Sequence, residues 1–240
     1  MSRLLDELAA DAWPPLEQQE VEGWRLRAAH GVTSRANSAL RLSGDALPLP
    51  EVERFYRERG LVPRVMATDD DVDEELAGRG WQASARGLVL AGPTPAGDAP
   101  DVELRTTPDH EWLTSWQRLD GRLSPGQVPT TSAQLARITA PAAYVSVRRG
   151  GRLVAVGRGV ADRGWLGIFS MCVLAGHRRA GHARRMLHAL GAWSGAPSTY
   201  LQVVEANVAA RRLYADVGLV PVSGYRYRTP PSDPAASVGA

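Results

Sequence analysis

The sequence predicts a mixed α/β protein built from two unequal parts. Two observations predict this class: segments with strand and helix patterns alternate along most of the 240 residues, and a stretch rich in glycine, proline and alanine at residues 91–100 interrupts them. We therefore expect a smaller domain over residues 1–95 and a larger one over residues 101–228. Residues 229–240 share the composition of the interrupting stretch, and we expect a disordered tail there.

Composition narrows the class of protein. The formal net charge of +2 is too small to imply a nucleic-acid or membrane partner by itself, and no run approaches the roughly 18 apolar residues of a spanning helix. The acidic N-terminal segment does not have the apolar core of a signal peptide. The single cysteine, Cys172, excludes a disulfide framework and favours a reducing compartment. We expect a cytoplasmic protein.

The elements of the larger domain have clear patterns. Apolar and polar residues alternate over residues 102–107, which predicts a half-buried strand, and Trp112 and Trp116 recur at helical spacing in the next segment, where we expect them in the core. The further elements are a hairpin over residues 142–160, a long apolar strand over 165–174, a helix with Ala183, Met186, Leu187, Leu190 and Trp193 on one stripe, a strand over 199–204, a helix over 207–218 and a last strand over 222–228.

The smaller domain has the same alternation of strands and helices as the C-terminal part of the larger domain, over fewer residues. Its expected elements are strands over residues 34–42, 62–68 and 82–92 and helices over residues 51–60 and 69–80. The helices expected over residues 69–80 and 207–218 both end in glycine before a bulky residue, as a C-cap requires. Leu76 and Tyr214 then fall at equivalent places, which indicates an internal duplication.

Residues 173–183, VLAGHRRAGHA, lie between the long apolar strand and the amphipathic helix. A helix N-terminus offers unpaired N–H donors and the positive end of the helix dipole, so it suits a diphosphate. Gly181 allows close approach because it has no Cβ, and Arg178 and Arg184 carry charge that matches phosphate. The sequence therefore predicts a phosphate-binding turn at this place.

The turn is similar to the Arg/Gln-x-x-Gly-x-Gly/Ala signature of the GNAT N-acetyltransferase superfamily. The same string occurs at residues 41–46, where Pro48 and Pro50 obstruct an immediate helix. Residues 201–221 supply a second match, to the Asn-x-x-Ala-x-x-Leu-Tyr-x-x-x-Gly-Phe segment of the family, although Leu219 replaces the usual aromatic residue. The residues that carry this match are Asn207, Ala210, Leu213, Tyr214 and Gly218.

The resemblance implies the GNAT fold, a mixed, mostly antiparallel sheet with flanking helices, preceded by a degenerate GNAT-like half as in tandem-GNAT proteins. It implies that acetyl-CoA is the cofactor and that a primary amine of a small molecule or peptide attacks its thioester directly in a ternary complex. The cofactor-binding residues that it implies are Met171, Cys172, Val173, Arg178, Arg179, Ala180, Gly181, His182, Ala183, Arg184, Asn207 and Tyr214.

The same resemblance implies roles in catalysis. Tyr214 is the candidate proton donor to the departing CoA thiolate, and a backbone N–H around residues 171–173 is the candidate donor to the oxyanion. Many relatives carry a glutamate where this chain has Gln202. Glu205 is the nearby candidate for the base, with a solvated acid at a strand end and a water-relayed base from elsewhere as the alternatives.

Other residues have simpler interpretations. We expect Cys172 to be a small buried apolar residue and not a nucleophile. His177 and His182 are expected to be exposed loop side chains, and no metal site is expected because no cysteine or carboxylate accompanies them at ligand spacing. Residues 120–135 are expected to form a mobile loop that lines the acceptor site, as in the family.

The sequence is compatible with two other functions. The protein could bind acyl-CoA without catalysis, as a sensor or interaction module, because the base is missing from its usual place. A nucleic-acid patch at residues 177–185 is disfavoured because no aromatic residues are interleaved with the arginines and the net charge is small. The protein is expected to be a monomer or a homodimer.

Overall fold

The computed structural model describes residues 2–44, 46–121 and 124–231 of the chain. The chain forms two compact units, and each unit is assembled from separate stretches of sequence. The large unit contains Met1–Pro14 and Leu88–Ser223, and the small unit contains Pro15–Gly87 and Gly224–Ala240. Most of the tail expected over residues 229–240 lies outside the described residues.

The two units differ in extent from the expected ranges of residues 1–95 and 101–228. Strand β6 (Gly87–Pro93) contributes Leu88 and Leu90 to the core of the large unit. The end of strand β12 (Val220–Thr229) belongs to the small unit, where it pairs antiparallel with β4. Each unit thus contains a strand from the opposite half of the sequence, because long-range pairing and not chain order decides where a strand belongs.

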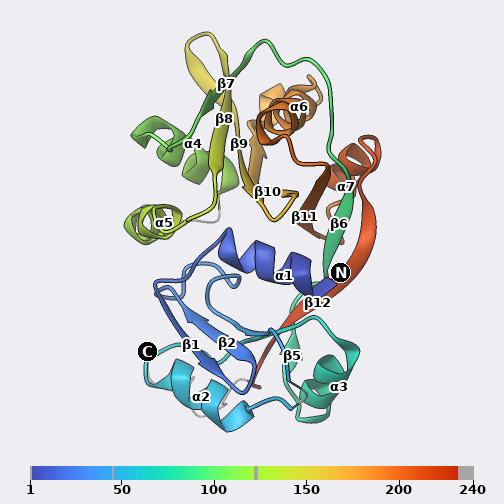
Figure 1. Ribbon diagram of the computed structural model, residues 1–240. Coiled ribbons are helices and arrows are strands. Elements are labelled where there is room, and N and C mark those ends of the chain that lie inside the picture. The colour runs from blue at the N-terminus through green and yellow to red at the C-terminus, as the bar shows by residue number, and fades with distance from the viewer. Residues whose placement is uncertain (1, 45, 122–123, 232–240) are drawn as a thin grey trace. The chain divides into compact units, whose positions relative to one another are not determined.

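The sheet of the large unit is mixed and mostly antiparallel, as predicted. Its strands lie in the order β6-β11-β10-β9-β8-β7, and β10 and β11 are parallel whereas β7 to β10 pair antiparallel (Figure 1). The bounds of these strands are β7 Val102–Arg105, β8 Ala142–Arg149, β9 Arg152–Asp162, β10 Trp165–Val173 and β11 Ser198–Val204.

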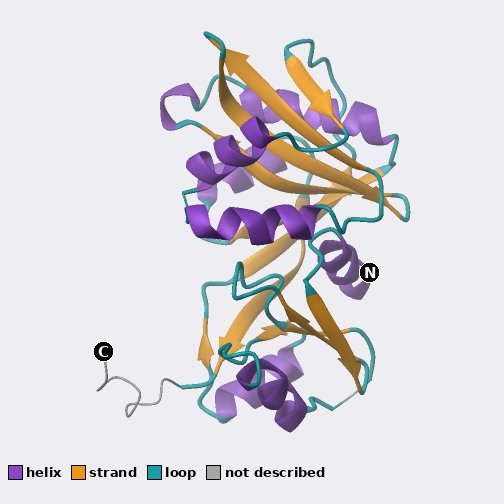
Figure 2. Cartoon of the chain, turned by 90° about the vertical axis from the view of Figure 1, so that its left-hand side faces the viewer, coloured by secondary structure: helices purple, strands orange, loops and turns teal. Residues whose placement is uncertain are grey.

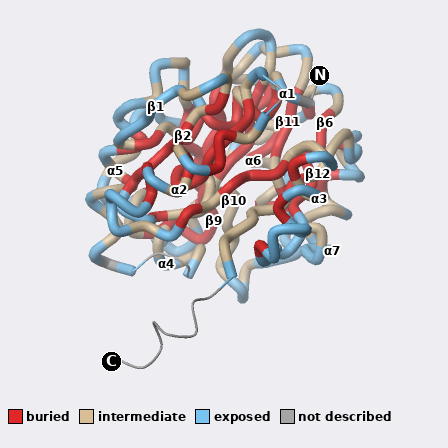
Figure 3. Tube along the Cα trace, turned by 90° about the horizontal axis from the view of Figure 1, so that it is seen from below, coloured by how far each residue is buried: buried red, intermediate tan, exposed pale blue. Residues whose placement is uncertain are grey.

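Helices cover both faces of this sheet (Figure 2). Helix α6 (His182–Ser194) packs on β8, β9 and β10, and α4 (His110–Asp120) packs on β9 and β10 from the other side. Met186, Leu187 and Leu190 of α6 are fully buried, which confirms most of the predicted apolar stripe. Trp112 and Trp116 of α4 are also buried, as expected. Figure 3 shows the buried positions running along β9 and β10.

The N-terminal helix α1 (Ser2–Asp11) belongs to the large unit because of the residues that follow it. Arg158 on β9 is fully buried, and its Nη1 donates to the carbonyl of Ala12 over 2.7 Å. The guanidinium lies between the rings of Trp13 and Phe169, at 4.8 and 4.7 Å from their centroids. Cation–π contacts of this kind stabilise an arginine that is removed from water. The sequence patterns did not predict this helix.

The small unit has a second sheet, in the order β1-β2-β3-β4-β12, with β5 also paired to β12. Its strands are β1 Glu17–Val21, β2 Trp24–Ala28, β3 Ala39–Arg41, β4 Val65–Ala67 and β5 Gln82–Ala83, and its helices are α2 Leu49–Arg57 and α3 Asp70–Gly78. The strand expected over residues 34–42 is reduced to β3. The buried side chain of Asn37 binds the backbone of Ala29, Gly31 and Val32, and so holds this stretch as a loop.

The two units share a local order of elements. In the small unit α2 connects the parallel strands β3 and β4, and in the large unit α6 connects the parallel strands β10 and β11. Helix α3 and helix α7 (Val208–Ala215) then end alike. The N–H of Trp81 donates to Leu76 O across Gly80, and the N–H of Leu219 donates to Tyr214 O across Gly218, both over 2.9 Å. Gly80 and Gly218 have positive φ, as the predicted C-caps require.

Candidate active site

Strands β10 and β11 separate before they end. Their parallel pairing runs from Trp165 and Ser198 to Ile168 and Leu201. Beyond that pair, β10 contains a bulge after Phe169 but stays paired with β9 as far as its last residue. A gap therefore opens between the two strands at their C-terminal ends, next to the start of α6.

The predicted phosphate-binding turn follows β10 directly. A short 3-10 segment (Ala175–His177) leads to Arg179, with φ of 61°, and to Gly181, with φ of 76°, which is the N-cap of α6. The left-handed conformation of Gly181 is one that only glycine adopts without strain. The first turn of α6 thus begins with N–H groups that have no carbonyl of their own helix to bond.

The arginines of the turn differ in their surroundings. The Nε of Arg178 donates to the carbonyl of Val173 over 3.2 Å, and Nη2 of Arg184 lies 3.1 Å from Oδ2 of Asp216. Arg179 is exposed. The other predicted cofactor-binding residues of this stretch are Ala180 and Gly181, which are exposed, and Met171, Val173 and Ala183, which are half-buried.

His182 corrects an expectation from the sequence. It is the first residue of α6 and is buried, not an exposed loop side chain, while His177 is half-buried. The Nδ1 of His182 lies 2.8 Å from Nη2 of Arg185. Burial, followed by the positive charges of Arg185 and Arg149, lowers the pKa of His182. A lowered pKa disfavours the cationic form that would attract phosphate.

The backbone of β10 points one donor into the gap. The N–H of Leu174 donates to Val154 O of β9 over 2.8 Å. Because successive amides of a strand point to opposite sides, the N–H of Val173 faces away from β9, toward the side that β11 has left. This is the range in which the oxyanion donor was predicted.

Helix α7 brings Tyr214 to the site. The Asn207 side chain accepts from the N–H of Ala210 over 3.1 Å and so caps the N-terminus of α7. Tyr214 is 7% exposed, and burial raises its pKa to about 12, with a smaller contribution from Cys172. At neutral pH the phenol therefore keeps its proton.

Cys172 is half-buried, whereas the sequence predicted a small buried residue. Its Sγ lies 3.8 Å from Oδ1 of Asp120, the last residue of α4. This contact brings a thiol and a carboxylate together near the gap. Patterns along the sequence could not reveal it, because the two residues are 52 positions apart.

Glu205 and Gln202, at or near the end of β11, differ in their hydrogen bonds. Glu205 is half-buried just beyond the end of β11, and its carbonyl accepts from Nη1 of Arg211 over 3.1 Å. Gln202 lies within β11. Among the described residues, neither polar atom of its buried side-chain amide has a hydrogen-bond partner. An unpaired buried amide costs free energy, so it is a candidate contact for a ligand.

Residues 125–135 are helical, whereas a loop was expected over residues 120–135. Residues 125–127 form a 3-10 turn and Val128–Leu135 form helix α5. Residues 122–123 lie outside the described residues. Thr131, Gln134 and Leu135 are buried, and this packing supports the helix.

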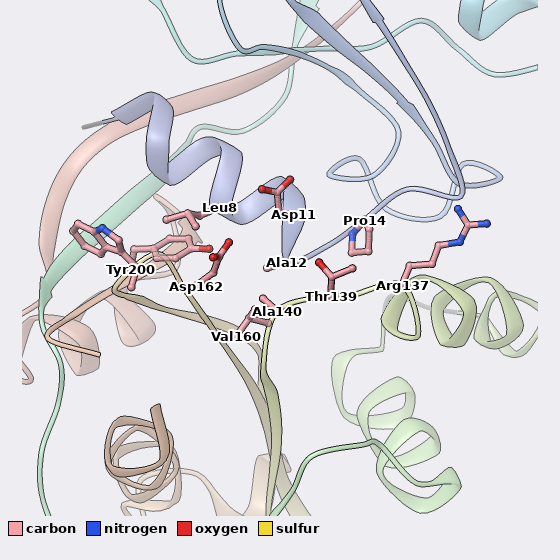
Figure 4. Close-up of a pocket in the computed structure, with 11 residues that line it drawn as sticks. Leu8, Asp11, Ala12, Pro14, Arg137, Thr139, Ala140, Val160, Asp162 and Tyr200 are labelled. Atoms are coloured by element: carbon pink, nitrogen blue, oxygen red, sulfur yellow. The ribbon is translucent and has the colours of Figure 1, made fainter. Parts of the chain in front are cut away.

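A cavity of about 180 Å³ lies elsewhere in the large unit (Figure 4). Asp11, Arg137, Asp162 and Tyr200 are among the residues that line it. It adjoins the starts of β10 and β11, whereas the phosphate-binding turn follows the end of β10. We therefore do not assign the site to this cavity.

The described residues contain neither a metal-binding group nor a membrane-spanning helix. No group of three or more histidine, cysteine, aspartate or glutamate side chains is placed to hold a metal ion. No helix in the described ranges is both long and apolar enough to cross a membrane.

Comparison with known proteins identifies the family. The family described as "Probable histone acetyltransferase Rv0428c C-terminal" matches residues 2–228. The chain is 27% identical over 245 residues to the "Uncharacterized N-acetyltransferase YobR" of Bacillus subtilis, which covers 94% of this chain and 97% of the relative. It is 33% identical over 153 residues to the "Probable histone acetyltransferase Rv0428c" of Mycobacterium tuberculosis, covering 57% of this chain and 49% of that protein.

Solved structures show the same fold. A GCN5-related N-acetyltransferase from Kribbella flavida has a TM-score of 0.71 at 14% identity, over 98% of both chains. A tandem GNAT protein from the clavulanic acid biosynthesis pathway has a TM-score of 0.64 at 14% identity, over 95% of this chain and 89% of that one. Because the family match spans nearly the whole sequence, the chain belongs to the Rv0428c C-terminal family and is a GNAT-type N-acetyltransferase.

Proposed function

We propose that the protein transfers the acetyl group of acetyl-CoA to a primary amine in a ternary complex. The observation that carries this proposal is the arrangement at the end of β10, where the gap beside β11, the left-handed Gly181 and the first turn of α6 follow one another. The diphosphate of the cofactor suits the N–H groups and the positive dipole end of α6. The exposed Arg179 adds a cation beside them.

The chain's own residues then have distinct tasks. The N–H of Val173 faces the gap and can donate to the thioester oxygen as negative charge develops there. Tyr214 stays protonated at neutral pH because burial raises its pKa to about 12, so it can give a proton to the departing thiolate. Glu205, beyond the end of β11, is the candidate that the sequence offers for the acceptor of the amine proton, directly or through water.

The acceptor is proposed from the relatives. The family and the Mycobacterium tuberculosis relative are both described as a probable histone acetyltransferase. A lysine amine of a protein tail is therefore the first acceptor to test, before polyamines and amino acids. We further propose that the enzyme works in the cytoplasm as a monomer or homodimer, which suits a chain with one cysteine.

The small unit is proposed to be a degenerate GNAT-like half without catalysis. The shared order of β3, α2 and β4 supports a duplication. Arg41 at its signature-like string is buried, with Nε bound to Gly44 O and Nη1 bound to Asp71. The side chain that would face a phosphate is thus held by the protein, and Leu76 stands where Tyr214 stands in the large unit.

Calorimetric titration with acetyl-CoA tests the proposal. We expect one site per chain in the wild type and its loss in Gly181→Glu, which places a carboxylate in the turn. Gly195→Glu is the matched control, because Gly195 also has positive φ but lies at the other end of α6. A thiol-release assay with a lysine-containing histone-tail peptide, spermidine and free lysine then tests transfer.

The outcomes separate the functions. Binding with transfer supports the acetyltransferase, and no binding refutes it. Binding without transfer to any of the three amines would favour the acyl-CoA sensor, for which Gln202 in place of a carboxylate is the supporting observation.

A further inference from the structure

Two side chains face the same side of the gap between β10 and β11. Met171 and Val173 pack on the core beneath α6 and α7, so Cys172 between them points to the opposite face. Leu201 and Val203 belong to the same core, so Gln202 between them also points to the opposite face. That face is the one covered by α4, because Cys172 contacts Asp120.

Asp120 occupies a position that helix stability does not explain. It is the last residue of α4, and Gly121 closes the helix in a left-handed conformation. The negative end of the helix dipole lies here, so a cation would be favoured and a carboxylate is disfavoured. A residue type that opposes its local structure indicates a functional site more often than chance placement does.

The carboxylate also lies beside the end of β10. Its Oδ1 is 3.8 Å from Cys172 Sγ, one residue before Val173, whose N–H faces the gap. Cys172 is in turn close enough to the phenol of Tyr214 to affect its titration. Asp120 of α4 and Tyr214 of α7 are thus both linked to Cys172, which directly precedes Val173 on β10.

We propose that Asp120, rather than Glu205, binds the acceptor amine as an ammonium ion and accepts its first proton, and that Gln202 positions the same amine through its unpaired amide. The proposal rests on the acetyltransferase function proposed for this chain. It also names the acceptor class, an alkyl ammonium ion, because a carboxylate paired with a neutral amide selects one positive charge.

The protons and bonds balance. The ammonium gives one proton to Asp120, and the neutral nitrogen forms a bond to the carbonyl carbon of the thioester. The carbon–sulfur bond breaks, the thiolate takes the proton of Tyr214, and Tyr214 is reprotonated by the second proton that the nitrogen loses. The products are the acetylated amine, the free thiol of CoA and the protonated Asp120, which returns its proton to water.

Asp120→Asn tests this assignment, with Asp98→Asn as the matched control because Asp98 is an exposed aspartate outside the site. We expect Asp120→Asn to lower kcat for the histone-tail peptide or spermidine by about 100-fold, as loss of a general base does. Its Kd for acetyl-CoA should stay within about twofold of the wild type. Asp120→Glu keeps the carboxylate and should recover part of kcat, which separates chemistry from misfolding.

A second readout needs no acceptor. The chain has one cysteine, so alkylation by iodoacetamide followed by mass spectrometry reports on Cys172 alone. Asp120→Asn should accelerate the labelling, because a neighbouring negative charge disfavours the reactive thiolate. Acetyl-CoA should slow the labelling in the wild type.

Each failure has its own meaning. If Asp120→Asn keeps full kcat, or if Glu205→Gln loses kcat while Asp120→Asn does not, the assignment of Asp120 is overturned and the acetyltransferase stands. If the wild type binds acetyl-CoA but acetylates none of the amines, the proposed function is refuted. The assignment of Asp120 is then refuted as well, because it rests on that function.

Discussion

Arg184 on α6 and Asp216 at the end of α7 form an ion pair, with 3.1 Å between Nη2 and Oδ2. The pair joins the helix that begins at the phosphate-binding turn to the helix that carries Tyr214. Both side chains are largely exposed, so the pair adds little to stability. The pair matters for cofactor binding, because Arg184 is a predicted phosphate-binding residue and the Asp216 carboxylate competes for its charge.

Removal of that carboxylate should therefore strengthen cofactor binding. Asp216→Asn releases Arg184 and removes a negative charge near the turn, and we expect the Kd for acetyl-CoA to fall roughly twofold to fivefold, the equivalent of about 0.5–1 kcal/mol. Calorimetry at low salt measures it. Weaker binding in this variant would show that Arg184 acts only through its ion pair.

Gly181 should be sensitive to a single methyl group. Gly181→Ala places a Cβ at φ of 76°, and we expect the free energy of unfolding to fall by about 1–3 kcal/mol. Gly176→Ala is the control, since Gly176 lies in the same turn with open space around it and without positive φ. Urea unfolding compares the two. Equal losses would mean that the conformation of Gly181 is not the cause.

The phenol of Tyr214 predicts a dependence of stability on alkaline pH. Its folded-state pKa of about 12 lies above the ordinary value of 10.0, so the folded state holds this proton more tightly. The resulting stability is complete below pH 10 and is lost as pH rises from 10 to about 12, up to about 3 kcal/mol in all. Tyr214→Phe should lack this part of the loss, as urea unfolding at several pH values would show.

The same substitution tests catalysis. Tyr214→Phe removes the proton donor but keeps the ring, so kcat should fall about 10²-fold with little change in the Kd for acetyl-CoA. Thiol release measures the first quantity and calorimetry the second. An unchanged kcat would assign Tyr214 to packing alone.

Strand β6 should be essential to the large unit. Leu90 is 2% exposed in a core built mostly from residues after 140, and Leu90→Ala should lower the free energy of unfolding by about 2–5 kcal/mol. Leu104→Ala at an exposed position should cost about 0.5 kcal/mol or less. A fragment of residues 101–228 lacks β6, and we expect it to show no cooperative unfolding transition. A cooperative transition in that fragment would contradict this account of the unit.

Local chemistry could be predicted from the sequence because it depends on neighbours along the chain. Asn207 caps α7 and Gly218 ends it, as their side chains and backbone preferences require. The apolar stripe of α6 follows from helical spacing in the same way. The turn at Gly181 was also recognisable, since its residue types directly follow a long apolar strand.

Two errors come from side-chain contacts that hydrophobic periodicity does not describe. His182 follows an exposed turn, yet it is buried at the first position of α6, beside Arg185. The strand expected over residues 34–42 gave way to a loop because Asn37 satisfies backbone groups that a strand would have paired. Hydrophobic periodicity along the chain does not predict either interaction.

The sequence by itself determined the class of fold, the family and the position of the turn that we propose to bind phosphate, because these depend on periodicity and on residue types at short spacing. Only the tertiary structure decided which strands complete each unit and which side chains meet at the gap. β6 joins the core of the large unit and the end of β12 joins the small unit, because sheet pairing acts across any length of chain. For the same reason Asp120 and Cys172 become neighbours only when α4 packs on β10.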